Sequence, residues 1–508
     1  MQILVVLEPM AKSAIIIGGG IGGLATACIL GKAGYKVTVL EKNEQLGGRA
    51  GQLKAQGYTF DTGPSWYLMP DVFQHFFELL GEDINDHLSL KRLNPSYRVY
   101  YKDRGQHIDI AGDTSIDRKT FETIEPGGAK QFDAYINRAE YIYDTAMGKL
   151  LYKNYDSLTD FVRGDIAVQA GRLRLFSKMD SYVRGFFKDV RLQQIMQYPL
   201  VFLGSSPYNA PAIYSLLSHV DFNQGVYYPM GGMYELVKAL VRIGKKYGVA
   251  YEVDSPVEQI IVKGGAAVGV RTKDKEMHAD LVISDADVHH TETKLLDKKY
   301  RDHSERYWSK RTMAPSALLM YLGVDRQYDS LRHHNLLFSK DWQKNFTQLF
   351  DEPVLPDDPS LYVCAPGKTD PSVAPKGHEN IFVLVPLAAG LHVSPKELDK
   401  YGEAILQTME QEMNLPGLRR HIAYKKSFGI DDFATRFNSY KGTGLGLSHT
   451  LQQTALFRPS NRSRKVKGLY YVGANVHPGI GVPITLISAE LLYKRLINDS
   501  TAKPLASL

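Results

Sequence analysis

Residues 14–41 read AIIIGGGIGGLATACILGKAGYKVTVLE and decide the fold. An apolar run at 14–17 is followed by a cluster of glycines, a helical pattern of apolar residues, and a second apolar run that ends in Glu41. Strand, glycine turn, helix and strand in this order predict a βαβ unit of a parallel sheet. Such a unit binds an adenine dinucleotide at the glycine turn.

Three glycines of this unit have separate physical tasks. Gly18 permits the tight turn, Gly20 lets the backbone approach a pyrophosphate, and Gly23 allows the helix to pack closely on the strand. The helix N-terminus offers free N–H donors and partial positive charge to that pyrophosphate. Glu41 is placed to accept hydrogen bonds from the adenosine ribose hydroxyls, and its charge disfavours the 2′-phosphate of NADP.

A second glycine pair follows the ribose acid. Lys42 stands directly after Glu41, and Gly48 precedes Arg49. The guanidinium of Arg49 is suited to pair with a diphosphate from the opposite side. This second clamp favours FAD over NAD as the cofactor.

Composition narrows the class of protein. The chain has 508 residues and a formal charge of +6, so we expect about two domains. Basic residues are scattered among acids and form no block, which argues against a nucleic-acid partner. An anionic membrane surface stays compatible with the charge. The two cysteines, Cys28 and Cys364, imply no disulfide framework and fit a reducing cytoplasm.

The N-terminal apolar run at 3–7 is too short for the core of a signal peptide. We therefore expect no export, and we expect translation to start naturally at Met10, with residues 1–9 as an extension.

The glycine-rich segments are far apart in sequence, which predicts an α/β protein with a discontinuous architecture. We expect a Rossmann-like dinucleotide-binding domain made of residues 10–110, 225–310 and 465–505. An inserted α+β domain, residues 111–224 and 311–464, would bind substrate and associate with a membrane. Residues 253–271 predict a strand pair with its turn at Gly264 and Gly265. The uncharged stretch 192–220 contains three prolines and predicts a buried helix with a pocket-lining loop rather than a membrane span.

From Gly18 to Arg49, together with FDTGP at 60–64, the chain resembles the flavin-containing superfamily of amine oxidases, protoporphyrinogen oxidase and carotenoid desaturases. The C-terminal YVGANVHPGIGVP at 471–483 resembles the segment that closes bacterial-type phytoene desaturases. Further matches are YNAP at 208–211, VYYPMGGM at 226–233 and FRP at 457–459.

The resemblance implies a monotopic FAD-dependent enzyme that removes hydrogens from a long isoprenoid and extends its conjugated polyene. It also implies that the backbone of Val257 contacts the adenine. In the C-terminal motif, Gly473, Gly479, Gly481 and Val482 would bring backbone N–H groups against the flavin. Because Ala474 stands where related oxidases often carry an acid, the ribityl contact would fall to backbone or to Asn475.

Hydride transfer to the flavin requires no side-chain nucleophile, so we assign no catalytic residue. His477 is the weak candidate for a base, and the alternative is that it fixes the loop by hydrogen bonding. The pairs His289-His290 and His333-His334 are expected to point in divergent directions, so we predict no metal.

Apolar residues recur at three- and four-residue steps between 175 and 191, with basic residues between them. This pattern predicts either a basic amphipathic helix on a membrane surface, with Phe186 and Phe187 in the lipid, or a helix packed on the protein's own core. We expect a substrate tunnel between this helix and residues 208–233, and a cytoplasmic enzyme on the inner membrane face.

Several alternatives stay open at this level. The substrate has thirty or forty carbons, as in dehydrosqualene or phytoene, or is an already coloured intermediate. A carotenoid oxidase, a saturase, an amine oxidase and a non-catalytic prenyl-lipid-binding protein share the same fold. The terminal electron acceptor is oxygen or a quinone, and the sequence indicates no oligomeric state.

Overall fold

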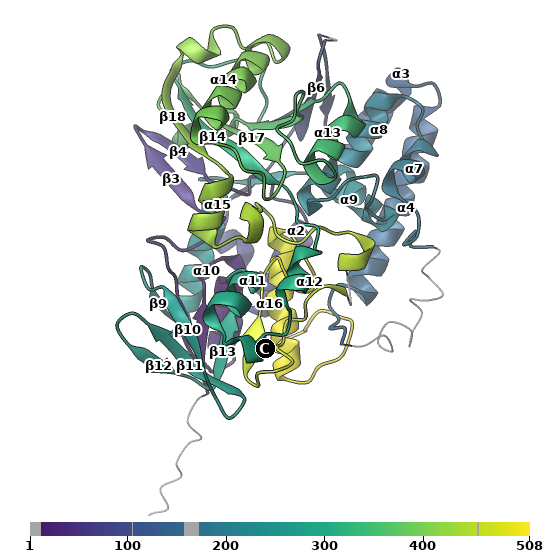
Figure 1. Ribbon diagram of the computed structural model, residues 1–508. Helices are drawn as coiled ribbons and strands as arrows, with labels where there is room; N and C mark the ends of the chain where they lie inside the picture. Colours follow the sequence, from purple (N-terminus) through teal and green to yellow (C-terminus); the bar gives the residue numbers. More distant parts are fainter. Residues whose placement is uncertain (1–11, 104, 157–171, 455–456) are drawn as a thin grey trace, which may run out of the picture.

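The computed structural model describes residues 12–103, 105–156, 172–454 and 457–508 (Figure 1). The segment before residue 12, where we expect the natural start at Met10, lies outside the described residues.

A five-stranded parallel sheet forms the lower body of the molecule (Figure 1). Its order is β19-β13-β1-β2-β9, and every neighbouring pair runs parallel. The strands come from three separate stretches of the chain, as the recurring glycine segments predict. They are β1 (Ser13–Ile17), β2 (Lys36–Leu40), β9 (Ala250–Glu252), β13 (Leu281–Ser284) and β19 (Leu469–Tyr471).

Helix α1 is buried on all sides because it is apolar all round. It packs against α16 (Val482–Leu496) and α10 (Tyr234–Lys246). The helices are α1 (Ile21–Lys32), α2 (Pro70–Leu79), α10 (Tyr234–Lys246) and α16 (Val482–Leu496).

The predicted strand pair is confirmed as an antiparallel hairpin whose turn residues Gly264 and Gly265 both have positive φ. It belongs to a three-stranded sheet at the edge of the lower body (Figure 1). Its strands are β10 (Val257–Lys263), β11 (Ala266–Thr272) and β12 (Glu276–His278).

A seven-stranded sheet of order β18-β14-β17-β16-β15-β6-β7 forms the upper body. The assignment of residues 97–110 to the first domain is wrong, because β6 pairs in parallel with β15 and carries β7 with it. Strand propensity does not reveal which sheet a strand joins. The strands are β6 (Tyr97–Tyr101), β7 (Gln106–Ile110), β14 (Ser316–Val324), β15 (His334–Phe338), β16 (Leu361–Cys364), β17 (Glu379–Leu387) and β18 (Ile422–Phe428).

Helices cover both faces of this sheet, with α14 on one side and a helical group on the other (Figure 1). They are α3 (Thr114–Ile124), α4 (Gly128–Lys149), α7 (Met179–Arg184), α8 (Val190–Gln197), α9 (Leu216–His219), α13 (Trp342–Phe350), α14 (Pro395–Glu412) and α15 (Ile430–Phe437). Short elements complete the fold: β3 (Gln52–Ala55), β4 (Tyr58–Asp61), β5 (Leu90–Arg92), β8 (Tyr227–Pro229), α11 (Val288–His290) and α12 (Glu305–Ser309).

The membrane-surface helix predicted between 175 and 191 is wrong. Only α7 is helical in its first part, and a turn at Gly185 separates it from α8. Phe187 is fully buried against Phe121, and Phe186 packs edge-on against Tyr135. Most of the apolar stripe therefore packs on the protein core, which is the alternative that the pattern also allowed, whereas Phe176 and Val190 are 79% and 46% exposed.

Candidate active site

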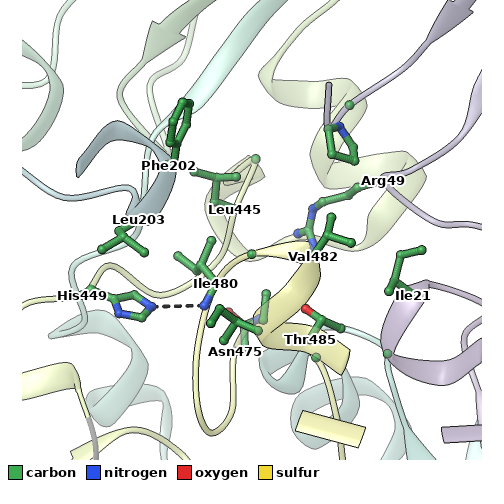
Figure 2. A pocket seen from close by; sticks show the side chains of 18 of the residues that line it. Ile21, Arg49, Phe202, Leu203, Leu445, His449, Asn475, Ile480, Val482 and Thr485 are labelled. Carbon is green, nitrogen blue, oxygen red and sulfur yellow. Dashed lines mark hydrogen bonds between the residues drawn. The ribbon is translucent and has the colours of Figure 1, made fainter. Parts of the chain in front are cut away.

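A large cavity of about 1230 Å³ lies between the two bodies. Its lower end is formed by the carboxyl ends of β1, β2 and β13 and by the loop that leads into α16 (Figure 2). Its upper part reaches the seven-stranded sheet. The volume exceeds the roughly 300–1,000 Å³ of a typical small-molecule site, so it has room for a cofactor and a second ligand.

The glycine turn forms one wall of the lower end. Gly18 has a φ of +98°, and both Gly18 and Gly20 line the cavity. A Cβ on Gly20 would meet the Asp285 carboxylate at 2.5 Å, so only glycine keeps this wall open. Gly23 does not line the cavity; its missing Cβ makes room for the Gly18 carbonyl, which is the close packing we expect.

Glu41 lies at the end of β2 and lines the cavity. Its carboxylate accepts hydrogen bonds of 2.8 Å from the backbone N–H groups of Gly19 and Asn43. These bonds hold the carboxylate beside the glycine turn. Its Oε1 atom also accepts from the Asn43 side-chain amide at 2.9 Å, so Oε2 is the atom that retains acceptor capacity for a ligand hydroxyl.

Arg49 supplies an unpaired donor to the cavity. Its guanidinium donates one bond of 2.7 Å to the Ser439 hydroxyl, while its buried Nε atom has no hydrogen-bond partner in the part of the chain that the structure describes. Burial lowers the pKa of Arg49 from its usual range. A buried cation with a free N–H fits an anionic group such as a diphosphate. The residues therefore suit a dinucleotide cofactor.

The neighbours of Arg49 lie along the same wall. Gly48, with a φ of +57°, lines the cavity. Lys42 also lines it, but its ammonium donates to the Thr435 carbonyl at 2.6 Å and thus ties the lower body to α15. Val257, the first residue of β10, lines the same wall, and its contact with adenine stays a prediction.

The C-terminal glycine loop forms the opposite wall (Figure 2). Gly473, Gly481 and Val482 line the cavity, and Gly481 directly precedes α16. Gly479 does not line it. A Cβ there would meet the ring of His449 at 2.3 Å, so this glycine serves packing and not the approach of a ligand.

His477 is buried within the same loop and reaches the cavity surface. Its Nε2–H donates to the Arg458 carbonyl at 3.1 Å, and its own carbonyl accepts from the Ser488 hydroxyl at 2.7 Å. Burial lowers the pKa of His477 to about 4. These contacts support the loop-fixing interpretation, while a role as base stays a prediction.

Three polar residues of the site were missed by sequence reasoning. Asp285 follows β13, and burial raises its pKa to about 8 despite bonds from the glycine turn. The Arg458 guanidinium donates to several carbonyls, among them Val476 at 3.1 Å and Leu447 at 3.0 Å, and so holds the C-terminal loop. His449 contacts the same loop. Single buried polar residues carry no periodic signal, although FRP at 457–459 already stood among the family matches.

The side-chain amide of Asn475 forms hydrogen bonds within the protein. Its Nδ2 donates to Asp287 at 2.9 Å, and its Oδ1 accepts from the Leu447 N–H at 3.0 Å. The side chain lines the cavity, yet its bonds orient the loop.

One face of the seven-stranded sheet forms the upper part of the cavity. Alternate residues of its strands point inward because side chains alternate along a strand. The aromatic residues Trp66, Tyr198 and Phe202 cover the side. Among the described lining residues the acidic ones are Glu41, Asp285 and Asp287, all at the lower end. The inward residues of the sheet are Ala317, Leu319, Leu336, Phe338, Tyr362, Phe382, Leu384 and Pro386.

The tunnel expected beside residues 208–233 is partly right. Residues between 211 and 220 line the cavity, together with Leu175 and Phe176, whereas 221–233 do not. In the part of the chain that the structure describes, no helix has the length and hydropathy of a membrane span.

The two histidine pairs differ. His289 and His290 diverge, toward Glu305 at 3.2 Å and Asn438 at 3.3 Å. His333 and His334 do not diverge as expected: their rings are 4.4 Å apart, and each places a nitrogen within 4.8 Å of the Cys364 sulfur.

Comparison with known proteins agrees with this geometry. Residues 21–491 match the family model described as flavin containing amine oxidoreductase. The chain is 47% identical to a carotenoid 3,4-desaturase of Haloarcula japonica, over 95% of this chain and 98% of the relative. A zeta-carotene-forming phytoene desaturase of Myxococcus xanthus shares 36% identity, over 96% and 94%. A 4,4′-diapophytoene desaturase of Staphylococcus aureus shares 32%, over 95% and 98%.

Among solved structures, an oxidoreductase from Methanosarcina mazei superimposes with a TM-score of 0.59 at 18% identity, covering 95% of this chain and 100% of that one. This likeness concerns the fold alone.

Proposed function

Because the chain belongs to the flavin-containing amine oxidoreductase family and is a FAD-dependent carotenoid desaturase, we propose that its preferred substrate is a coloured, already conjugated acyclic carotenoid. The identity of 47% with a carotenoid 3,4-desaturase supports a late substrate over phytoene. Phytoene is the second candidate, favoured by the 36% identity with a phytoene desaturase.

The two-part cavity is the observation that favours a hydrocarbon substrate over an amine. Its lower end has the polar contacts that a dinucleotide needs, and its upper part is formed by one apolar face of a sheet. The ammonium group of a buried amine substrate would require a nearby carboxylate, because burying an unpaired charge is costly. The described lining has acidic groups only at the dinucleotide end, so the upper part suits a hydrocarbon.

We assign FAD contacts to the residues that line the lower end. Gly18 and Gly20 would face the diphosphate, with Arg49 across from them, and Glu41 would accept from the ribose. Val257 would contact the adenine. On the opposite wall Gly473, Gly481 and Val482 would approach the flavin, while Lys42 and Gly48 shape the wall beside Arg49.

When bound, FAD supplies the hydride acceptor for the desaturation. The contribution of the chain is to position the polyene and to exclude water. Apolar residues on alternate positions of β14, β15 and β17 would hold an extended hydrocarbon along the sheet. No base is assigned; the Nε2 and the carbonyl of His477 form structural bonds, while its buried Nδ1 has no hydrogen-bond partner among the described residues.

The cavity mouth suggests how a water-insoluble substrate arrives. Phe176, Phe457 and Leu451 line the cavity and are exposed by 79%, 56% and 39%. We propose that this mouth rests on the cytoplasmic membrane surface, from which the substrate enters. A peripheral position would also give access to a quinone, with oxygen as the other candidate electron acceptor.

The deciding experiment expresses the gene in cells that make phytoene, dehydrosqualene or a coloured acyclic carotenoid. We expect new, longer-wavelength absorption maxima with the coloured carotenoid, and none from a Gly20→Val variant. Conversion of phytoene alone would favour the second candidate. Conversion of dehydrosqualene alone would indicate that the substrate has thirty carbons and not forty.

A further inference from the structure

Two histidines and a cysteine converge at the end of the seven-stranded sheet, outside the large cavity. His334 begins β15 and pairs with Cys364, the last residue of the antiparallel neighbour β16. His333 immediately precedes β15. The three ligand-capable atoms lie within 4.8 Å of one another, and the three residues are exposed by 4% or less.

Both imidazoles are oriented by bonds through one nitrogen only. Nδ1 of His333 is 2.7 Å from the Thr369 hydroxyl, and Nδ1 of His334 is 2.7 Å from the Tyr362 hydroxyl. Among the described residues, both Nε2 atoms are buried without a hydrogen-bond partner. Leaving a buried polar atom unpaired costs roughly 1–3 kcal/mol, so two such atoms in one buried cluster require an explanation.

Aromatic rings hold the imidazoles in place. Trp66 stacks on His334 with a centroid separation of 4.1 Å and an interplanar angle of 9°. Tyr228 meets His333 edge-on at 4.6 Å. An imidazole fixed by a hydrogen bond on one nitrogen, with the other nitrogen free, is the usual arrangement of a metal ligand.

We propose that His333, His334 and Cys364 bind a zinc ion through the two Nε2 atoms and the sulfur. Imidazole and thiolate are the ligands that zinc prefers, and three protein ligands leave one position open. Bond lengths of about 2.0–2.3 Å place tetrahedral ligand atoms about 3.3–3.6 Å apart, so small side-chain rotations close the site. On binding, the Cys364 thiol loses its proton to solvent and its sulfur forms the bond to zinc.

The open position has a place for water. A second cavity, of about 20 Å³, lies against Cys364 and is also lined by Asp61 and Tyr228. A site needs about 10–15 Å³ to hold one water molecule. Of the three ligands only Cys364 lines this cavity, so a water bound there would reach the ion from the side of the sulfur.

The site would stiffen the substrate end of the large cavity. The Tyr362 hydroxyl joins His334 to Ser65, and Trp66 covers the same imidazole. Ser65, Trp66 and Tyr362 all line the large cavity, whereas the three ligands do not. The metal would thus position residues and take no part in hydride transfer.

The test measures metal content of untagged, full-length, FAD-loaded protein after growth with zinc and exhaustive dialysis. We expect about one zinc per chain, and at least a fivefold loss in Cys364→Ser and His334→Gln. The matched control is Cys28→Ser, since Cys28 is the other buried free thiol and lies in α1. Its zinc content should equal that of the wild type. Retained FAD reports that each variant is folded.

A second measurement uses the wild-type protein alone and requires no variants. Chelator-treated wild type titrated with Co²⁺ should gain a thiolate-to-cobalt charge-transfer band in the near ultraviolet. Absence of this band, or less than about a tenth of an equivalent of zinc in the wild type, overturns the proposal. Unchanged zinc in folded Cys364→Ser does so too.

Discussion

The Nε2 atom of His449 accepts a hydrogen bond of 3.1 Å from the backbone N–H of Ile480 (Figure 2). Nδ1 of the same ring must then carry the proton, and it lies 2.9 Å from the Tyr214 hydroxyl. Since burial keeps the pKa of His449 well below its usual range, the ring stays neutral and keeps this acceptor. The contact ties the upper body to the loop that leads into α16.

Replacing His449 with alanine should therefore weaken FAD binding about tenfold, because loss of a buried hydrogen-bond acceptor costs roughly 1–3 kcal/mol. Fluorescence titration of apoprotein with FAD measures this. His392→Ala, at an exposed histidine, is the control. Equal affinity in both variants would show that the loop holds its shape without His449.

Gly20→Ala should yield apoprotein, because its Cβ would lie 2.5 Å from the Asp285 carboxylate at the diphosphate wall. The matched control is Gly148→Ala in α4, where a Cβ would meet nothing within 4 Å. FAD content per chain after purification is the readout. If the Gly20→Ala enzyme retained full flavin, the glycine turn would not be part of the cofactor site.

Arg49→Met should lower FAD affinity by about 10- to 100-fold, since charge-assisted bonds contribute roughly 1.5–3 kcal/mol. It should leave the fold intact because it removes a buried cation whose Nε has no partner in the protein. The control is Arg419→Met, a surface arginine that pairs with Glu410 at 2.9 Å. If both variants bind FAD alike, Arg49 does not face the cofactor.

Phe176→Asp and Phe457→Asp should reduce sedimentation with anionic liposomes and leave the melting temperature unchanged, because both side chains are exposed at the cavity mouth. Ile116→Asp in α3 is the control, since Ile116 is 47% exposed but does not line the cavity. Phe187→Asp should instead unfold the protein, because Phe187 is buried. Undiminished binding by both mouth variants would reject this mouth as the membrane face.

Stability should fall as pH decreases from about 6.5 toward 4. The unfolded state takes up a proton on His477 near its ordinary pKa of about 6.5, whereas the folded state resists until about pH 4. The unfolded state thus binds more protons in this window and gains population. His477→Gln should flatten the fall in melting temperature between pH 7 and pH 5, and His392→Gln should not. An identical fall in both variants would contradict the depressed pKa of His477.

The βαβ unit, the hairpin turn at Gly264 and Gly265 and the buried character of residues 192–220 followed from local pattern, since strand and helix periodicities are written into neighbouring residues. The placement of β6 and the burial of Phe187 did not follow. In both cases the packing partner, β15 for β6 and Phe121 for Phe187, lies far away in the sequence. The same periodic stripe serves a membrane helix or a core helix, and Gly185 ends α7 before the stripe is complete.

Within the site, Glu41 and Arg49 were predictable because their roles depend on spacing from a glycine turn. His449, Arg458 and Asp285 were not, because each acts through a contact with backbone far away in sequence. Gly479 shows the limit most clearly: a glycine in a glycine-rich motif invites assignment to the ligand, and only the position of the His449 ring reveals that it serves packing.

The sequence alone determined that residues 14–41 form a dinucleotide-binding unit and, through Glu41 and Arg49, that FAD is its ligand, because these features depend on short-range spacing along the chain. Only the tertiary structure decided which residues form the apolar part of the cavity and its exposed rim, and that His333, His334 and Cys364 meet. Such meetings depend on the register between strands that are distant in sequence, and no local pattern encodes that register.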